Sequence, residues 1–332
     1  MPNTSWNKLL FLDLTRQTLI PGTMTDYDAT VAFDRVLSSI SILTCERVGL
    51  GEFMYHLLKN MEFNVVTGFG RSATTYINNE DPNASGEGVF QGSSSAAPLY
   101  TLNADISLSA YDHMGTGATF IHPISKVAFS GKASQFVDDK TQFLNLLSLT
   151  TDHDMMRIPR HEQSTLLQQA GTRNSQAWAD LLWVSGGNLN LDKCFTDSML
   201  PTYSFTTAST KVEKLPLPHP LTISNPSNHQ SHTIAQIAPT FAKRTLGVIM
   251  APNGSNRLQL KHTFLKAKTF LGQIRHATLS GKARWLATQM VLEPGVIYPL
   301  MASFFTQKEL SSIQSIMSQF QCSALDLNRN FS

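Results

Sequence analysis

A segment rich in proline limits how this chain of 332 residues can fold. Residues 214–240 hold five prolines among many small polar residues, and this composition argues against a continuous helix or a central strand. A chain of this length has room for about two domains. We therefore expect a first domain over residues 1–213, a linker over residues 214–240 and a second domain over residues 241–332.

The two sides of this segment carry opposite charge. Residues 1–213 have 14 Lys and Arg against 21 Asp and Glu, a net charge of −7, and residues 214–332 have 12 against 3, a net charge of +9. No acidic residue occurs between Lys214 and Leu292. A basic region of this length indicates that the second domain binds a polyanion.

Composition excludes several classes of protein. Hydrophobic residues make up 42% of the chain, which is enough to form a packed core, so a disordered chain is excluded. There is no run of 18 apolar residues that predicts a membrane span, and the N-terminus lacks the pattern of a signal peptide. Three isolated cysteines, Cys45, Cys194 and Cys322, favour a reducing compartment. We expect an intracellular protein, nuclear or cytoplasmic, that is not secreted and has no membrane partner.

Apolar periodicity predicts strands and helices in the first domain and mainly helices in the second. Strands are expected over residues 23–29, 126–137, 140–147 and 188–195. Helices are expected over residues 32–45, 93–111, 160–184, 258–276, 281–292 and 306–320, and Gly186-Gly187 is typical of a helix end. The fold class that follows is α+β, with a basic helical region at the end of the chain.

Acidic residues occur at two predicted strand ends. Asp28 follows the first strand, and Asp138-Asp139 form the turn of a predicted hairpin. Carboxylates that crowd together repel one another unless a cation lies between them. Mg²⁺ prefers a few carboxylates together with substrate phosphates, and a pair of such ions promotes in-line displacement at phosphorus. The pattern therefore predicts a site for two Mg²⁺ ions, with Mn²⁺ as a substitute.

Four short segments resemble motifs A to D of reverse transcriptases, of the non-LTR retroelement and group II type, and they occur in the order of that family. They are DATVAFDR (28–35), GVFQGS (88–93) with Pro98, FVDD (136–139) and GNLNLDK (187–193), and Leu246-Gly247 is similar to the motif E turn. The resemblance spans about residues 20–250. It implies a palm of antiparallel strands backed by helices, followed by a helical thumb.

The resemblance also implies roles for the charged residues. Asp28 matches the carboxylate that binds both metal ions, Asp138 matches the second essential ligand, and Asp139 matches a looser ligand. Lys193 matches the lysine that protonates the leaving pyrophosphate as a general acid. Asp26 and Asp34 are expected to be structural.

Three further residues match positions that contact the incoming nucleotide. Phe33 matches the aromatic residue under the sugar, where a bulky ring excludes a 2′-hydroxyl by shape. Gln91 and Gly92 match the loop that packs against the nucleotide and the template base, and glycine permits a close approach of the backbone.

The basic region is expected to hold a primer–template duplex by its phosphates. Lys261, Lys268 and Arg275 are seven residues apart, so one helix could present them along one face. Lys282 and Arg284 follow within the same acid-free segment.

These expectations describe an RNA-directed DNA polymerase, a nucleotidyltransferase whose partners are dNTPs and an RNA or DNA template with a primer. Two alternatives remain open: a retroelement remnant that binds nucleic acid without turnover, and an RNA-templated RNA polymerase, against which Phe33 argues. The first is motivated by departures from the family pattern. Only about 25 residues precede motif A, where the family has its fingers, and SSSAA separates Gly92 from Pro98. The sequence therefore permits a truncated or decayed copy, and the oligomeric state stays open.

Overall fold

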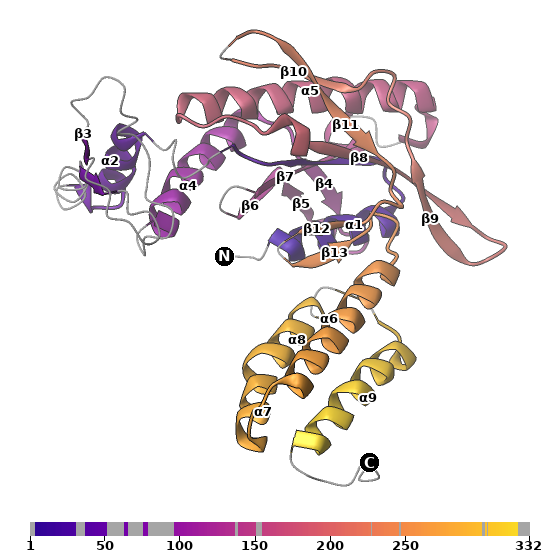
Figure 1. Cartoon of the computed structure of the whole chain (residues 1–332). Coiled ribbons are helices and arrows are strands. Elements are labelled where there is room, and N and C mark those ends of the chain that lie inside the picture. The colour runs from indigo at the N-terminus through magenta and orange to yellow at the C-terminus, as the bar shows by residue number, and fades with distance from the viewer. Residues whose placement is uncertain are drawn as a thin grey trace. The chain divides into compact units, whose positions relative to one another are not determined.

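The computed structural model describes residues 4–30, 37–51, 63–65, 76–78, 96–136, 139–150, 155–226, 228–245, 247–300, 303 and 305–324. The chain divides into two compact units, which are described separately (Figure 1). The sheet unit comprises residues 20–200 and 215–237, and the helical unit comprises residues 1–19, 201–214 and 238–332.

A single large sheet forms the centre of the sheet unit. Its strands follow the order β10-β11-β8-β1-β7-β6, and β9 also pairs with β8. The β11–β8 pair is parallel, and the other pairs of this order are antiparallel. The strands are β1 (Gly22–Tyr27), β6 (Ala133–Phe136), β7 (Asp139–Asn145), β8 (Phe195–Ser204), β10 (Leu221–Ser224) and β11 (Ser231–Ile237), while β9 (Ser209–Lys214) and the last residues of β8 belong to the helical unit.

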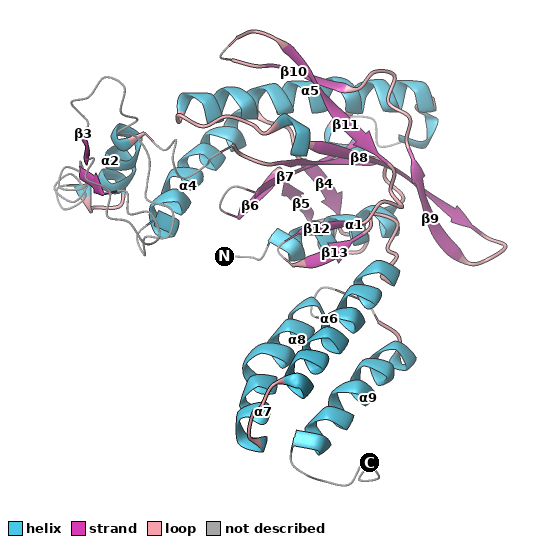
Figure 2. Cartoon of the chain, in the orientation of Figure 1, coloured by secondary structure: helices cyan, strands magenta, loops and turns pink. Residues whose placement is uncertain are grey.

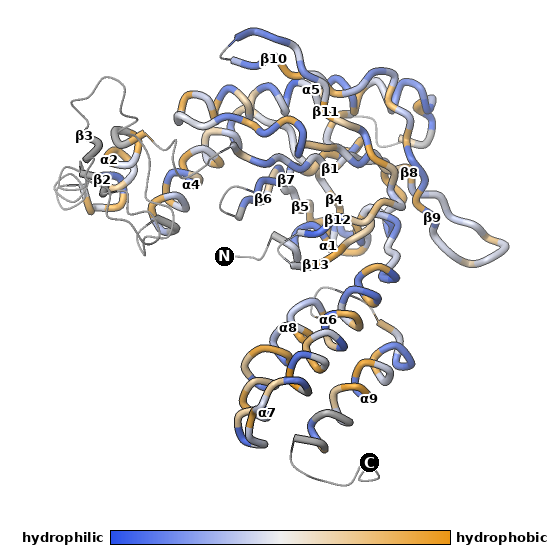
Figure 3. The backbone as a smooth tube through the Cα atoms, viewed as in Figure 1, coloured by the Kyte–Doolittle hydropathy of each residue, from blue (hydrophilic) through white to orange (hydrophobic). Residues whose placement is uncertain are grey.

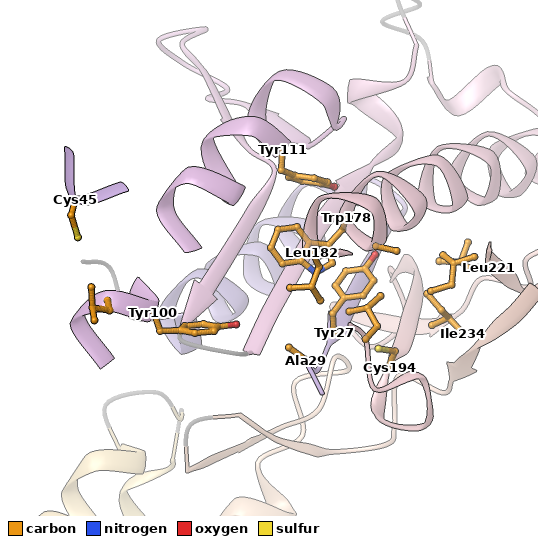
Figure 4. Close-up of a cluster of buried hydrophobic side chains, with 14 residues drawn as sticks. Tyr27, Ala29, Cys45, Tyr100, Tyr111, Trp178, Leu182, Cys194, Leu221 and Ile234 are labelled. Carbon is orange, nitrogen blue, oxygen red and sulfur yellow. The ribbon is translucent and has the colours of Figure 1, made fainter. Parts of the chain in front are cut away.

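Two helices cover one face of this sheet, α4 (Ala96–Met114) and α5 (Arg160–Val184), and α2 (Ser38–Arg47) packs against α4 (Figure 2). The side chains between helices and sheet form a core around Tyr27, Tyr111 and Trp178 (Figure 4). Gly171 lets α5 approach the sheet, because a Cβ there would lie 3.1 Å from a methyl carbon of Leu221. The core therefore joins segments from both ends of the unit.

Shorter elements complete the sheet unit. Two small hairpins pair β2 (Phe63–Val65) with β3 (Tyr76–Asn78) and β4 (Ala118–Ile121) with β5 (Ala128–Gly131). Single 3₁₀ turns occur at Leu146–Ser148, Met155–Arg157 and Leu191–Lys193.

The helical unit has a core of its own. Side chains of α6, α8 and α9 bury Ala267, Leu271, Val296 and Ile313 against one another, and Figure 3 shows hydrophobic and hydrophilic positions alternating along these helices. Gln259 joins the β12–β13 hairpin to α6, because its Oε1 accepts a 2.6 Å hydrogen bond from the backbone N–H of Ile249. The elements are α1 (Thr4–Thr18), β12 (Lys243–Thr245), β13 (Val248–Met250), α6 (Arg257–His276), α7 (Gly281–Ala287), a π-helical turn (Thr288–Leu292), α8 (Glu293–Leu300) and α9 (Gln307–Ala324).

The predicted α+β class is confirmed, with a main sheet backed by helices. The long helix over residues 160–184 is also confirmed. A hairpin forms near Asp138-Asp139, but Asp139 belongs to β7, and the strand expected over residues 126–137 is divided into β5 and β6. The expectation that residues 214–240 lack regular structure is wrong, since β10 and β11 lie there and extend the sheet. The strand expected over residues 188–195 is also wrong, because a 3₁₀ turn occupies Leu191–Lys193 and β8 begins only at Phe195.

Candidate functional site

The ends of β1 and β7 bring two of the predicted metal ligands to one place. In this antiparallel pair Asp26 lies opposite Thr141 and Tyr27 lies opposite Lys140. Continuing the register by one residue places Asp28 opposite Asp139. Side chains alternate along a strand, so these two carboxylates share the face on which the Thr141 hydroxyl donates a hydrogen bond to Asp26.

The β6–β7 hairpin sets the position of Asp139. Phe136 pairs with Asp139 and Gln135 pairs with Lys140, so two residues connect the strands. Asp138 is one of these two and lies outside the described residues. Asp139 is therefore the first residue of β7, the strand that neighbours β1, whereas the sequence predicted that it belongs to the turn.

The segment after α5 returns to the end of β1. Gly186 has a positive φ of +91° and ends the helix with a 2.9 Å hydrogen bond from its N–H to the Trp183 carbonyl. The chain then runs beside residues 28–30, where the N–H of Asn190 donates to the carbonyl of Asp28 and the N–H of Thr30 donates to that of Asn188, both at 2.8 Å. These backbone contacts bring the motif D segment to Asp28.

An ion pair joins the predicted general acid to the predicted metal ligand. The Lys193 Nζ lies 3.2 Å from Asp28 Oδ2, and the two side chains are 65% and 21% exposed. Lys193 itself lies at the end of the 3₁₀ turn Leu191–Lys193. The ion pair thus combines the partly buried carboxylate of Asp28 with the exposed ammonium group of Lys193.

The opposite face of the same strand ends holds a buried lysine. The Lys140 side chain is 1% exposed, and its Nζ lies 3.3 Å from the centre of the Tyr111 ring and 3.5 Å from that of Trp178. Burial holds the pKa of Lys140 well below its usual value, and the charge of Asp112 opposes this shift. Sequence reasoning did not single out Lys140, because the aromatic residues around it come from distant elements.

Tyr27 links this buried lysine to the sheet and to α5. Its hydroxyl donates a 2.7 Å hydrogen bond to Gln142 Oε1 and lies 2.8 Å from Ser175 Oγ. Burial raises the pKa of Tyr27 above that of a free tyrosine, and the hydrogen bond with Ser175 opposes this shift. Tyr27 immediately precedes Asp28, so the network fixes the backbone from which Asp28 projects.

The oxygen ligands at this edge are suited to a hard cation. Asp28 and Asp139 supply carboxylates from neighbouring strand ends, and Asp138 adjoins Asp139 in the sequence. Carboxylate oxygens are the protein ligands that Mg²⁺ prefers. Within the described residues, no group of three or more His, Cys, Asp or Glu side chains lies close enough to hold a metal ion. The two-metal site stays a prediction that involves Asp138.

Several predicted nucleotide contacts fall outside the described residues. Phe33, Gln91 and Gly92 are among them, and so is Leu246 of the motif E resemblance. Its neighbour Gly247 is described and has a positive φ of +87° in the turn between β12 and β13.

The predicted phosphate-binding residues lie in the helical unit. Lys261, Lys268 and Arg275 belong to α6, and Lys282 and Arg284 belong to α7. Lys261, Lys268 and Lys282 are exposed. Within the part of the chain that the structure describes, none of these three lysines and neither Arg257 nor Arg284 forms an ion pair with a carboxylate.

Two of the basic side chains adjoin a cavity in this unit. Arg257 and Lys261 line a space of about 430 Å³ together with Asn253 and Ser255. On the same helix, the Lys268 Nζ lies 4.7 Å from the centre of the Phe264 ring. Arg284 differs from the exposed lysines, since its Nε donates a 2.9 Å hydrogen bond to the Leu279 carbonyl. No helix of the described residues combines the length and apolar character of a membrane span.

Comparisons with known proteins give a limited result. No model of a known protein family matches the chain, and no curated protein does. Among solved structures, the chain is similar to telomerase from Candida tropicalis in complex with the TWJ fragment of telomeric RNA, with a TM-score of 0.39 and 14% identity over 96% of this chain and 43% of that chain. For the corresponding telomerase complex from Candida albicans, the TM-score is 0.38 and the identity 11%, over 97% and 48% of the two chains. The chain spans less than half the length of both telomerase chains.

Proposed function

We propose that this chain is an RNA-directed DNA polymerase of the retroelement type, which extends a primer by transferring nucleotides from dNTPs. The observation that carries this proposal is the register of β1 and β7, whose last pair, Tyr27 with Lys140, adjoins Asp28 and Asp139 in the sequence. The ion pair between Asp28 and Lys193 adds the third motif to the same place. Both observations support the arrangement of motifs A, C and D that the resemblance implies.

Each predicted site residue has its own role in the proposed reaction. Asp28, Asp138 and Asp139 would hold two Mg²⁺ ions, and when bound these ions would supply activation of the primer 3′-hydroxyl and charge neutralisation at the leaving pyrophosphate. Lys193 donates a proton to the pyrophosphate as the bond to the α-phosphorus breaks. Phe33 excludes nucleotides with a 2′-hydroxyl.

The helical unit supplies the contact with the duplex. Lys261 and Lys268 are exposed on α6 and have no carboxylate partner among the described residues, so both are available to phosphates. Contacts of this kind fix the position of a duplex without reading its sequence. By the resemblance, Gln91 and Gly92 would contact the templating base pair.

Primer extension on an RNA template tests the proposal. Asp28→Asn and Asp139→Asn are expected to reduce the rate of incorporation by at least about 100-fold, because each removes a charged ligand of the metal ions. Asp26→Asn is the matched control: Asp26 lies on the same strand and face, but it is held by Thr141, and an amide oxygen can still accept that hydrogen bond. Incorporation that is equally fast in the wild type and in Asp139→Asn would refute the metal role.

A second candidate function is nucleic-acid binding without turnover. It is favoured by the net charge of +9 on residues 214–332. It predicts that the full chain binds a primer–template duplex with strong dependence on salt and extends no primer with Mg²⁺ or Mn²⁺. Measuring binding by fluorescence anisotropy alongside extension of the same duplex separates the two functions.

A further inference from the structure

The contacts of Lys140 are unusual for a strand residue. Its side chain is buried, its Nζ makes no hydrogen bond within the described part of the chain, and three aromatic rings surround it. Tyr111 comes from α4, Trp178 from α5 and Tyr27 from β1, with ring centres 3.3, 3.5 and 5.8 Å from the Nζ. Figure 4 shows these three rings gathered between the helices and the strand. We call this arrangement the lysine box.

A buried amine without a hydrogen bond costs free energy of desolvation. The aromatic faces compensate for this cost in the protonated lysine, because each ring face attracts an ammonium group. Such contacts are directional, so they restrict the position of the lysine more than packing alone does. The contacts with the three rings therefore fix the position of residue 140.

The position that is fixed adjoins the proposed metal site. Lys140 is the residue after Asp139, and Tyr27 is the residue before Asp28. They form the last pair in the register of β1 and β7, beyond which the strand ends. Neighbouring side chains of a strand point to opposite faces of the sheet. The lysine box therefore fixes the strand ends from the face that α4 and α5 cover, and the two carboxylates project from the other face.

We propose that Lys140 is a positioning residue, which keeps Asp139 beside Asp28 through its contacts with Tyr27, Tyr111 and Trp178. This inference rests on the proposed function for its consequence, namely that the two carboxylates hold metal ions. Groups that hydrogen-bond to metal ligands typically change metal affinity by 10- to 100-fold when they are removed, and we expect the lower end of this range for Lys140, because it supports Asp139 through the backbone. Lys140 is expected to act through the carboxylates, without contact with a metal ion or substrate.

Mn²⁺ binding to the full chain, measured from the EPR signal of the free ion, provides the first test. Lys140→Met keeps a similar length and volume but removes the amine. We expect it to weaken Mn²⁺ binding by about tenfold while circular dichroism stays unchanged. The control is Lys132→Met, which removes a half-buried lysine of the sheet unit that is not part of the lysine box. Equal Mn²⁺ affinity in Lys140→Met and the wild type would overturn the positioning role and leave the proposed function standing.

Hydrogen exchange of the backbone amides provides a test that needs no metal. Lys140→Met is expected to speed exchange of residues 139–142 by about tenfold, because local opening of the strand end becomes easier. If the wild type binds no Mn²⁺, the proposed function fails, and exchange alone decides the positioning role: unchanged exchange overturns it. If Lys140→Met does not fold, Trp178→Leu removes one ring of the lysine box instead, and the same two measurements apply.

Discussion

Removing the lysine that pairs with Asp28 is expected to change metal binding and catalysis in opposite directions. The Lys193 Nζ lies 3.2 Å from Asp28 Oδ2, so a metal ion must displace it from the carboxylate that it binds. Two unit charges at this distance attract by about 1.3 kcal/mol in water. Lys193 is 65% exposed, which reduces the contribution of such a pair to about 0.2–1 kcal/mol. Lys193→Met should therefore tighten Mn²⁺ binding by between about 1.5-fold and fivefold.

The same substitution should slow primer extension. Lys193 is the proposed donor of a proton to pyrophosphate, and removal of a general acid costs about 100-fold or more in rate. Mn²⁺ titration by EPR and single-turnover extension measure the two effects on one preparation. Lys126→Met is the control, because Lys126 is an exposed lysine of the sheet unit on the connection between β4 and β5. Mn²⁺ binding that is unchanged or weaker in Lys193→Met would refute the competition between lysine and metal.

Three further predictions concern other parts of the chain. Burial raises the pKa of Tyr111. Its buried hydroxyl makes no hydrogen bond among the described residues, so Tyr111→Phe should raise the free energy of unfolding by about 1 kcal/mol in urea at pH 7. The folded chain keeps this tyrosine neutral, so stability is lost as the pH rises above about 10, the value in the unfolded chain, and Tyr111→Phe should reduce that loss. Gly187→Ala should destabilise the chain by about 1–3 kcal/mol in the same assay, because its Cβ would lie 2.7 Å from Leu182 Cδ1. The double variant Lys261→Gln, Lys268→Gln should lower the slope of log affinity against log salt concentration by about 2 for duplex DNA, and an unchanged slope would show that neither lysine contacts phosphate.

The sequence was informative where local pattern and tertiary structure agree. Apolar periodicity and the two glycines that follow gave the bounds of the helix at residues 160–184, because its buried positions recur at helical spacing. The hairpin of β6 and β7 was also predictable, since two runs with strand character flank the acidic pair, but the spacing did not show that Asp139 is already part of β7. Asp28 and Lys193 were identified by motif, and their contact depends on backbone pairing that spacing alone does not reveal.

The prolines of residues 214–240 led to the wrong prediction that this segment lacks regular structure. Pro216, Pro218 and Pro220 lie in the irregular stretch before β10, where they break no pairing, and Pro226 lies in the turn before β11. β10 is an edge strand, so it needs hydrogen bonds on one side only. A segment rich in proline can therefore extend a sheet when its prolines fall between the strands.

The lysine box explains why the candidate site could be only half predicted. Motifs identify the residues that face a substrate, because chemistry restricts the side chains that can act there. The residues behind them are restricted by packing, and packing depends on which helices cover the sheet. Lys140 follows an acidic pair, and nothing in its local sequence distinguishes it from a solvated lysine. Tyr111 and Trp178 contact Lys140 only because α4 and α5 pack against the sheet. These contacts fix the position of Lys140 next to Asp139.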